Sequence, residues 1–206
     1  MNDKNIPDIV IGRLPVYLRS LQRMEQEGRQ VTSSQELGER LGISAAQIRK
    51  DLSQFGEFGK QGTGYNIEYL SNQLLEILHI DRTWDVVIVG AGDIGSALAT
   101  YNGFSHRGFR VVGIFDNDPD KVGDKVGDYV VANTSDIEEQ IQANNIQVAM
   151  LAVPAGNAQA VASELIDAGV RAILNYAPVS LNVPPDVRVQ YIDPAIHLQR
   201  MTYYLD

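Results

Sequence analysis

The chain has 206 residues, 44 % of them hydrophobic, and contains no cysteine. This length allows one large domain or two smaller ones, and the composition is ordinary for a globular protein. The lack of cysteine excludes disulfides, thiolate catalysis and cysteine-ligated metal sites, and it fits a reducing cytoplasm. The start of the chain lacks a signal-peptide pattern, and no apolar run has membrane-spanning length. We therefore expect a cytoplasmic protein without a membrane partner.

The net charge of −9 is unevenly distributed along the chain. Residues 1–82 contain 10 Lys/Arg and 11 Asp/Glu, a net of −1, whereas residues 83–206 contain 7 and 15, a net of −8. A near-neutral segment can still present a basic face, because attraction depends on the field where contact occurs. The acidic total therefore does not exclude nucleic-acid binding by the first part.

Residues 8–27 have the apolar spacing of an amphipathic helix, in which Pro15 fits only near a boundary or a kink. Gly28 ends this pattern. The apolar positions at helical spacing are Ile11, Leu14, Leu18, Leu21 and Met24.

Two short capped helices are predicted next, within residues 31–55. Ser33 and Glu36 form a capping box before a helix that ends at Gly42, and Ser44 and Gln47 form another before a helix over residues 45–55. Two such helices joined through a glycine turn predict a helix-turn-helix.

The second of these helices has one apolar and one polar face. Ile48, Leu52 and Phe55 are expected to pack inward. Gln47, Lys50 and Gln54 line the opposite face, with Arg49 and Ser53 beside it. Residues of these types read base edges and phosphates in a major groove, although an ordinary solvated face has the same appearance. The candidate DNA-binding residues here are Ser44, Gln47, Arg49, Lys50, Ser53 and Gln54.

A glycine-interrupted run, EFGKQGTGYNI, follows this helix and predicts a β-hairpin wing whose tip approaches a phosphate backbone. A helix-turn-helix with a wing is moderately specific for duplex DNA. A further helix over residues 69–80 leads to a domain boundary near residues 81–85, so residues 1–82 are expected to form the DNA-binding domain. The candidate DNA contacts in the wing are Lys60, Gln61, Gly62, Thr63 and Tyr65.

Residues 86–118 have the order strand, turn, helix, strand in which a G-x-G-x-x-G sequence holds a dinucleotide. An apolar run at 86–89 precedes the sequence GAGDIG, and a second apolar run ends at Asp116. Gly90 permits a tight turn, Gly92 has no Cβ to obstruct a pyrophosphate, and Gly95 lets helix and strand pack closely. The candidate cofactor contacts in the loop are Gly90, Ala91, Gly92, Asp93, Ile94 and Gly95.

Asp116 lies 21 residues after Gly95 (116 − 95), where a carboxylate can accept hydrogen bonds from the adenosine ribose hydroxyls. Because Asp118 follows with no Arg between the two carboxylates, a 2′-phosphate would be repelled and NAD(H) is favoured over NADP(H). Coenzyme A or another nucleotide on the same scaffold is the alternative.

The α/β alternation continues to residue 193. Strands are predicted at 126–131, 148–154, 172–178 and 187–193, and helices at 135–145, capped by Ser135, and at 157–169. This alternation predicts a parallel sheet of Rossmann type over residues 83–192, with helices on both faces and ligands beyond the strand C-termini. Residues expected on the nicotinamide side, each equally compatible with a plain loop role, are Val153, Pro154, Asn175, Ala177 and Pro178.

The tail, residues 193–206, is predicted to be a final helix, with Asp193 as its N-cap and Pro194 as its first residue. Its apolar stripe, which includes Leu198, Met201 and Leu205, must pack on its own sheet or on a second subunit. A dimer is also what a module that reads palindromic DNA requires.

The chain resembles the Rex family of redox-sensing transcriptional repressors nearly from end to end. The resemblance is carried by RLPVYLRSL (13–21), TSSQELGERLGISAAQIRKDLSQFGEFGKQGTGY (32–65), VGAGDIGSAL (89–98), GIFDNDPDKVG (113–123), LNYAPVSLNVP (174–184) and the IDP before the final helix. Pro194 departs from the family, in which a bulky apolar residue often follows the Asp.

The resemblance implies a homodimer whose winged-helix domains bind palindromic operators and whose Rossmann domains bind NAD(H), with the last helix exchanged between subunits. It also implies that NADH releases the protein from DNA whereas NAD⁺ permits binding. Arg19, Tyr101 and Asp193 match the switch positions of the family, and Tyr101 and Asp193 are counted among its cofactor-site residues. A salt bridge between Arg19 and Asp193 in one domain arrangement, with Tyr101 competing for the carboxylate in another, is the expected switch.

Two rival functions stay open at this point. A dinucleotide fold most often serves hydride transfer, but about 120 residues of α/β structure leave no substrate domain, and no convincing acid/base pair is present. We therefore expect no enzyme and no metal site. The other rival is a DNA-binding regulator that senses a different nucleotide-like ligand.

Overall fold

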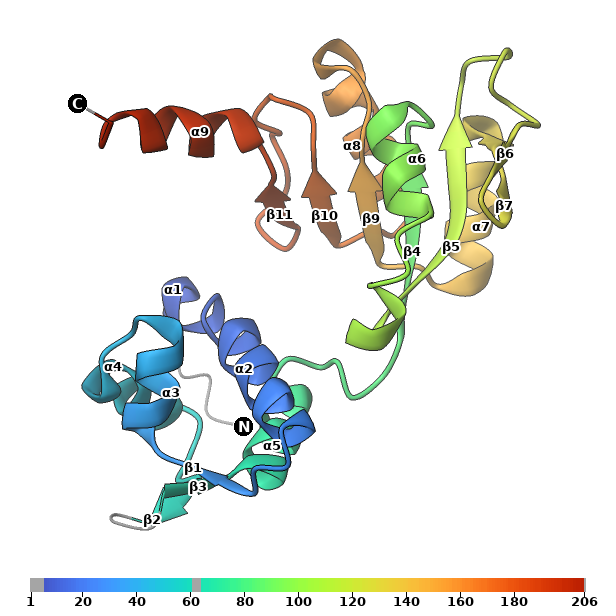
Figure 1. The fold of residues 1–206 in the computed structure, drawn as a ribbon. Coiled ribbons are helices and arrows are strands. Elements are labelled where there is room, and N and C mark those ends of the chain that lie inside the picture. Colours follow the sequence, from blue (N-terminus) through green and yellow to red (C-terminus); the bar gives the residue numbers. More distant parts are fainter. Residues whose placement is uncertain (1–5, 61–63, 206) are drawn as a thin grey trace. The chain divides into compact units, whose positions relative to one another are not determined.

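The structure is a computed structural model and describes residues 6–60 and 64–205. The chain divides into two compact units, Met1–Arg82 and Thr83–Asp206 (Figure 1), and each contains its own hydrophobic core. The division falls in the polar segment that follows the last helix of the first unit.

Helices make up most of the first unit. The predicted helix at 8–27 is two helices, because the chain breaks at Gly12 and Arg13. Pro15 lies in the first turn of the second one, where a backbone N–H has no intrahelical partner to lose. The helices of this unit are α1 (Asp8–Ile11), α2 (Leu14–Gln26), α3 (Ser34–Leu41), α4 (Ala45–Leu52) and α5 (Ile67–Ile77).

The helix-turn-helix is present in α3 and α4. The Ser33 and Ser44 hydroxyls accept hydrogen bonds from the backbone N–H of Glu36 and Gln47, as their spacing predicts. Gly42 ends α3 with a φ of 66°, a left-handed conformation that disfavours a side chain. Helix α4 ends at Leu52, three residues earlier than predicted, because residues 53–55 form a turn.

The wing is an antiparallel sheet in the order β1-β3-β2. The predicted hairpin is formed by β2 (Gly59–Lys60) and β3 (Gly64–Asn66). Strand β1 (Val31–Thr32), which the sequence pattern did not predict, pairs with β3. The wing therefore begins beside the helix-turn-helix. Beneath it, the core of the unit is built chiefly from α2, α3, α4 and α5.

The second unit contains a six-stranded parallel sheet in the order β11-β10-β9-β4-β5-β8. Strands β9, β10 and β11 end earlier than the apolar runs predict, so the last residues of those runs lie in loops at the C-terminal edge. The strands are β4 (Trp84–Val89), β5 (Phe109–Asp116), β8 (Ala132–Asn133), β9 (Val148–Leu151), β10 (Ala172–Asn175) and β11 (Arg188–Tyr191).

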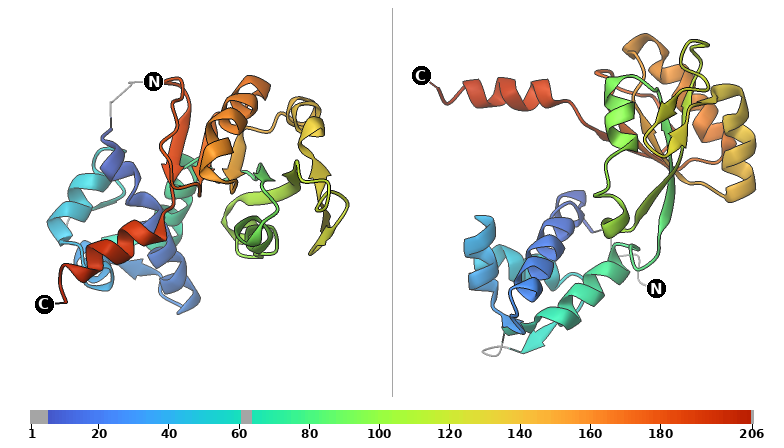
Figure 2. Two further views of the ribbon diagram at one scale, coloured as in Figure 1. Left: turned by 90° about the horizontal axis from the view of Figure 1, so that it is seen from above. Right: turned by 45° about the vertical axis from the view of Figure 1, so that its right-hand side comes forward.

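Helices cover both faces of this sheet (Figures 1 and 2). Alternate residues of β4 belong to different clusters: Val87 and Val89 pack with α7 (Ile137–Asn144) and α8 (Ala155–Ala168), whereas Val86 and Ile88 pack on the side of α6 (Asp93–Ala99). This two-sided burial explains the continuous apolar runs of the strands. The predicted α/β class is confirmed.

Two local predictions in this unit are wrong. The predicted strand at 126–131 is a small antiparallel pair, β6 (Lys125–Val126) and β7 (Tyr129–Val130), because the chain reverses at Gly127, where φ is 59°. Ser135 does not cap α7. It lies in the short helix η2 (Thr134–Asp136), where its backbone N–H donates to Asn133 instead. A further short helix, η1 (Ser105–Arg107), precedes β5.

Helix α9 (Pro194–Thr202) extends from the end of β11 (Figure 1), and none of its residues is buried. Asp193 is its N-cap, with Oδ1 2.9 Å from the backbone nitrogen of Ala195. The apolar stripe is exposed within the unit, with Leu198 and Met201 each 62 % exposed. Across the described residues, no helix is long and apolar enough to cross a membrane, and no cluster of side chains there suits a metal ion.

Candidate functional sites

The three glycines of the loop after β4 have different reasons to lack a side chain. A Cβ on Gly90, whose φ is 103°, would overlap the carbonyl oxygen of Ala152, and a Cβ on Gly95 would overlap that of Gly90. These two glycines are required by the fold itself. A Cβ on Gly92 would meet no atom within 4 Å. Gly92 therefore borders open space at the start of α6, where backbone N–H groups favour an anionic ligand.

Asp116 lies at the end of β5, directly beside this loop. Its Oδ2 accepts a hydrogen bond from the backbone nitrogen of Ala91 at 2.8 Å, and its Oδ1 accepts one from that of Asp118 at 2.9 Å. Burial alone would raise the pKa of Asp116, but these bonds and Lys121 outweigh it and lower the pKa. Asp116 is therefore an ionised, fixed acceptor at the edge of the loop.

Lys121 is a charged site residue that the sequence pattern did not predict. Its Nζ lies 3.2 Å from Asp116 Oδ2 and 3.5 Å from Asp118 Oδ2. A carboxylate has about four acceptor positions. Three of those on Asp116 are used by the protein, so one ribose hydroxyl can be accepted directly and a second requires Lys121 to move aside. The sequence signal for the contact between Lys121 and Asp116 is limited to their separation of five residues.

A cavity of about 810 Å³ lies beyond the strand C-termini in the second unit. Its wall includes these residues predicted from the sequence: Gly90, Gly92, Asp93, Ile94, Asp116, Val153, Pro154 and Pro178. Asp118, predicted as the second carboxylate at the ribose end, is also part of the wall. The prediction did not include the remaining wall residues, which are Val89, Asn117, Lys121, Thr134, Ala152, Gly156, Asn157, Ala160, Val161, Glu164 and Tyr176. Burial raises the pKa of the Tyr176 phenol, which therefore lines the cavity in its neutral form.

Asn175 and Ala177, which were predicted for the nicotinamide side, are not among the residues that line this cavity. The Asn175 amide is fully buried: Nδ2 donates to the carbonyl oxygens of Ala177 and Val179, and Oδ1 accepts from the Ala177 nitrogen at 2.9 Å. Its polar atoms hold the loop together, and Ala177 belongs to the core. Ala91 and Gly95 are not among the wall residues either. The backbone N–H of Ala91 binds Asp116, and Gly95 packs against the carbonyl of Gly90.

The three expected switch residues are not gathered in this cavity. Tyr101 lies just beyond α6, where its hydroxyl accepts a hydrogen bond from Arg107 Nη1 at 3.0 Å and its ring meets Phe104 edge to face. Asp193 caps α9. Arg19 is exposed on α2, in the other unit. The switch among these three residues stays a prediction.

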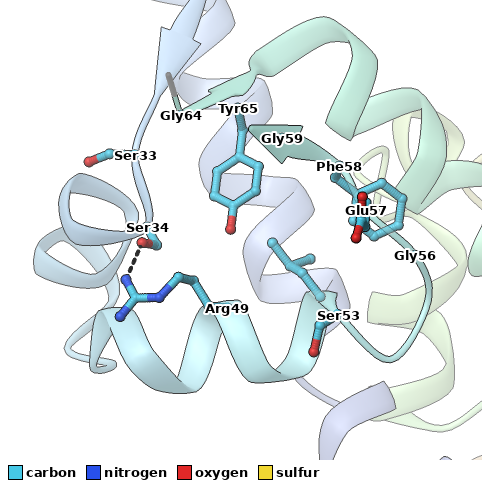
Figure 3. A pocket seen from close by; sticks show the side chains of 11 residues that line it. Ser33, Ser34, Arg49, Ser53, Gly56, Glu57, Phe58, Gly59, Gly64 and Tyr65 are labelled. Atoms are coloured by element: carbon cyan, nitrogen blue, oxygen red, sulfur yellow. Dashed lines mark hydrogen bonds between the residues drawn. The ribbon is translucent and has the colours of Figure 1, made fainter. Parts of the chain in front are cut away.

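In the first unit, a hollow of about 800 Å³ lies between α4, the start of α3 and the wing. Figure 3 shows Arg49 reaching from α4 to Ser34, with Nη1 2.8 Å from the hydroxyl oxygen, and the Tyr65 ring pointing from β3 toward α4. Ser53 lies at the far end of the same helix. A guanidinium, hydroxyls and a phenol on one rim are groups that contact DNA phosphates.

The other predicted DNA contacts differ in what their side chains do. Lys50 is exposed and Gln54 is half-buried, and the Ser44 hydroxyl caps α4. Gln47 is half-buried, and its Nε2 donates to Asp51 Oδ1 at 2.7 Å, so its amide is held by the protein. The backbone of Lys60 belongs to β2, and Gln61, Gly62 and Thr63 lie outside the described residues.

Comparison with known families follows the division of the fold. A family model described as "Putative DNA-binding protein N-terminus" matches residues 5–53, and one described as "CoA binding domain" matches residues 81–179. The fold and the two sites therefore define a class of protein in which a winged-helix unit precedes an α/β unit of the nucleotide-binding type.

Relatives that match along the whole chain narrow this class to one family. The redox-sensing transcriptional repressor Rex of Chloroflexus aggregans is 53 % identical over 199 residues, which cover 97 % of this chain and 94 % of the relative. The Rex of Carboxydothermus hydrogenoformans is 45 % identical over 203 residues, 98 % of each chain. The chain belongs to the Rex family of redox-sensing transcriptional repressors.

Solved structures agree with this assignment. RSP in complex with β-NAD⁺ and operator DNA matches with a TM-score of 0.92 at 41 % identity, over 97 % of this chain and 92 % of that one. RSP in complex with β-NADH matches with a TM-score of 0.87 at 39 % identity, over 97 % and 94 %. The family resemblance and the class of fold expected from the sequence are confirmed.

Proposed function

We propose that this chain is a repressor that binds palindromic operator DNA as a homodimer and is released when NADH replaces NAD⁺. The observation that carries the proposal is the end-to-end match to a relative solved with both NAD⁺ and operator DNA. The winged-helix unit reads the DNA, and the α/β unit senses the ratio of NADH to NAD⁺. The protein acts in the cytoplasm.

The second unit offers groups that suit a dinucleotide. The space beside Gly92 is open, since a Cβ there would meet no protein atom within 4 Å. It therefore accepts a pyrophosphate against the N-terminus of α6. Asp116 accepts a ribose hydroxyl, and Val153, Pro154 and Pro178 provide an apolar wall for the nicotinamide end. NAD(H) is bound as a regulatory ligand, and the protein does not catalyse hydride transfer.

The two forms of the ligand differ by one positive charge on the nicotinamide and by the planarity of its ring. A carboxylate and a cation near that ring can therefore favour one form electrostatically. In the proposed switch, Arg19 pairs with Asp193 in one domain arrangement and Tyr101 takes the carboxylate in the other. Reversing a 1:99 population requires about 5.5 kcal/mol of differential affinity, a demand that two sites of a dimer can share.

Asp193 needs a variant that separates its charge from its capping role. Asp193→Asn retains an acceptor for the Ala195 N–H, since Asn caps helices about as well as Asp, but it removes the charge. We expect this variant to bind operator DNA and to respond weakly to NADH in a gel shift. An NADH response equal to that of the wild type would exclude the switch role of Asp193.

The function as a whole is tested by selecting duplexes from a random-sequence pool with the full-length protein, and then titrating NADH, NAD⁺ and NADPH against the bound duplex. We expect an inverted repeat to be selected and NADH to release it at lower concentration than either other nucleotide. Selection of no sequence would contradict the repressor function, and release by all three nucleotides alike would contradict redox sensing.

A second ligand is a candidate because the family model that matches residues 81–179 is described as a CoA binding domain. Coenzyme A carries a ribose 3′-phosphate, which Asp116 and Asp118 of the cavity wall would oppose and Lys121 would attract. We therefore expect coenzyme A to bind more weakly than NADH in isothermal titration. Tighter binding of coenzyme A would reassign the sensed ligand while leaving the DNA-binding function in place.

A further inference from the structure

Asp51 of α4 accepts four hydrogen bonds, and none of them comes from the backbone. Arg13 Nε and the Tyr17 hydroxyl each donate to Oδ2 at 2.6 Å. Arg13 Nη2 donates to Oδ1 at 2.8 Å and Gln47 Nε2 donates to the same oxygen at 2.7 Å. The side chain has no exposed surface, and its bidentate pair with Arg13 spans 38 residues of sequence.

This carboxylate is ionised despite its burial. Burial by itself would raise the pKa of Asp51, but the bonds from Arg13, Tyr17 and Gln47 outweigh that effect and lower the pKa. Burial also raises the pKa of Tyr17, which therefore stays a hydrogen-bond donor. A buried charge with all of its acceptor positions filled favours one arrangement of the groups around it, because any displacement leaves a donor or the charge unsatisfied.

The cluster joins elements with different tasks. Arg13 and Tyr17 lie at the start of α2, whereas Asp51 and Gln47 lie on α4, the helix that carries Arg49 and Lys50. The hydrophobic core already holds the two helices together. Apolar contacts, however, are not directional, and reading a base edge requires side chains to be held within about 0.5 Å of the productive geometry. A directional anchor on the inner side of α4 supplies this constraint.

We propose that Asp51 is the positioning residue of α4, the second helix of the helix-turn-helix: by binding Arg13 and Tyr17 at the start of α2 and orienting the Gln47 amide, it sets the operator specificity of the protein. The inference rests on the proposed DNA-binding function. It concerns discrimination between sequences, as distinct from overall affinity for DNA, which phosphate contacts dominate. Asp51 itself touches no DNA, since its side chain is enclosed.

Two substitutions weaken this anchor in different ways. Asp51→Asn keeps the shape, but its NH₂ group faces an Arg13 donor whichever way the amide is turned, because Arg13 donates to both oxygens of Asp51. Tyr17→Phe removes a single bond to Oδ2 and leaves the charge and the core shape intact. Asp8→Asn, at an exposed position of α1, is the matched control for the change of charge.

The charge effect and the positioning effect have opposite signs, which makes the experiment decisive. Removing a negative charge from the DNA-binding unit slightly tightens binding to any duplex, and both Asn variants share this effect. The affinities of full-length variants are measured for the duplex selected by the wild type and for a scrambled duplex of equal composition, by fluorescence anisotropy at one salt concentration. Circular dichroism checks folding, and NADH titration checks the second unit.

We expect the ratio of operator affinity to scrambled affinity to fall about tenfold in Asp51→Asn and about threefold in Tyr17→Phe, and to stay unchanged in Asp8→Asn. NADH affinity stays unchanged in all three variants. If Asp51→Asn does not fold, the ratio for Tyr17→Phe decides. An unchanged ratio in folded variants overturns the positioning role alone, whereas a wild type that selects no sequence removes the proposed function and this inference with it.

Discussion

The ammonium nitrogen of Lys121 lies 3.2 Å from Asp116 Oδ2, at the end of the cavity where the glycine loop begins. The sequence pattern of two acidic residues without Arg predicts strong exclusion of a 2′-phosphate. Lys121 lies between these carboxylates and weakens that exclusion, because it supplies a positive charge at the same place. Asp116 and its two backbone donors keep the site suited to a ribose hydroxyl.

Lys121→Gln is expected to increase the preference for NADH over NADPH about fivefold. With the cation removed, Asp116 and Asp118 repel a 2′-phosphate by roughly 1 kcal/mol more, a figure that allows for the solvent exposure of the lysine. Isothermal titration with both nucleotides measures the ratio. Lys125→Gln, an equal change of charge outside the cavity wall, is the control. An unchanged ratio in Lys121→Gln would show that the lysine does not act on the ribose end.

Gly92→Ala and Gly95→Ala are expected to separate ligand binding from folding. Ala at 92 meets no protein atom, and the backbone there is extended with a φ of −78°, so the melting temperature should not change. NADH affinity should fall tenfold or more, because the Cβ fills space beside the pyrophosphate position. Ala at 95 would overlap the Gly90 carbonyl and should destabilise the fold by about 1–3 kcal/mol. Equal NADH affinity in Gly92→Ala and the wild type would remove the ligand from this loop.

Arg49→Gln is expected to weaken binding to operator and scrambled DNA by similar factors, about tenfold each. A phosphate contact carries no sequence information, and its loss lowers the slope of log affinity against log salt by about 1. Anisotropy titrations across a salt series give the slope. Arg23→Gln, at an exposed position of α2 away from the hollow, changes the charge equally and should leave the slope unaltered. A loss confined to the operator would instead indicate base contact by Arg49.

Met201→Asp is expected to convert the proposed homodimer into a monomer. No residue of α9 is buried within the unit, so the charge should leave the melting temperature of the monomer nearly unchanged while preventing burial of the stripe on a second subunit. Sedimentation velocity measures the oligomeric state. Gln199→Asp places the same charge on the same helix outside the stripe and should remain dimeric. A dimeric Met201→Asp variant would show that α9 does not form the interface.

Asp116→Asn is expected to lower the free energy of unfolding of the second unit by about 1.5–3 kcal/mol at pH 7, as for hydrogen bonds to a charged group. Because the folded pKa of Asp116 is lowered, its contribution is fully present above the ordinary pKa of Asp and is lost as the pH falls through the folded value. Urea unfolding at a series of pH values should therefore show the two proteins converging in acid. A constant difference at all pH values would contradict the ionised role.

Local patterns in the sequence were sufficient for most elements and for the family. The caps at Ser33 and Ser44, the glycine loop and the run ending at Asp116 all act over a few residues, so periodicity and spacing reveal them. The strand predicted at 126–131 failed because Gly127 reverses the chain between Val126 and Tyr129. Apolar content alone does not distinguish a buried strand from a small hairpin.

The tertiary structure decided which polar groups are free to bind a ligand. Asn175 follows a strand like any site residue, yet its amide is consumed by the loop at 177–179. Gln47 is one of the predicted DNA contacts, and its amide is oriented by Asp51, which also binds Arg13, 38 residues away from Asp51 in the sequence. Most helices and strands, and their order, could be predicted because they depend on neighbouring residues. The hydrogen-bond partners depend on contacts between distant segments, and only the folded chain determines them.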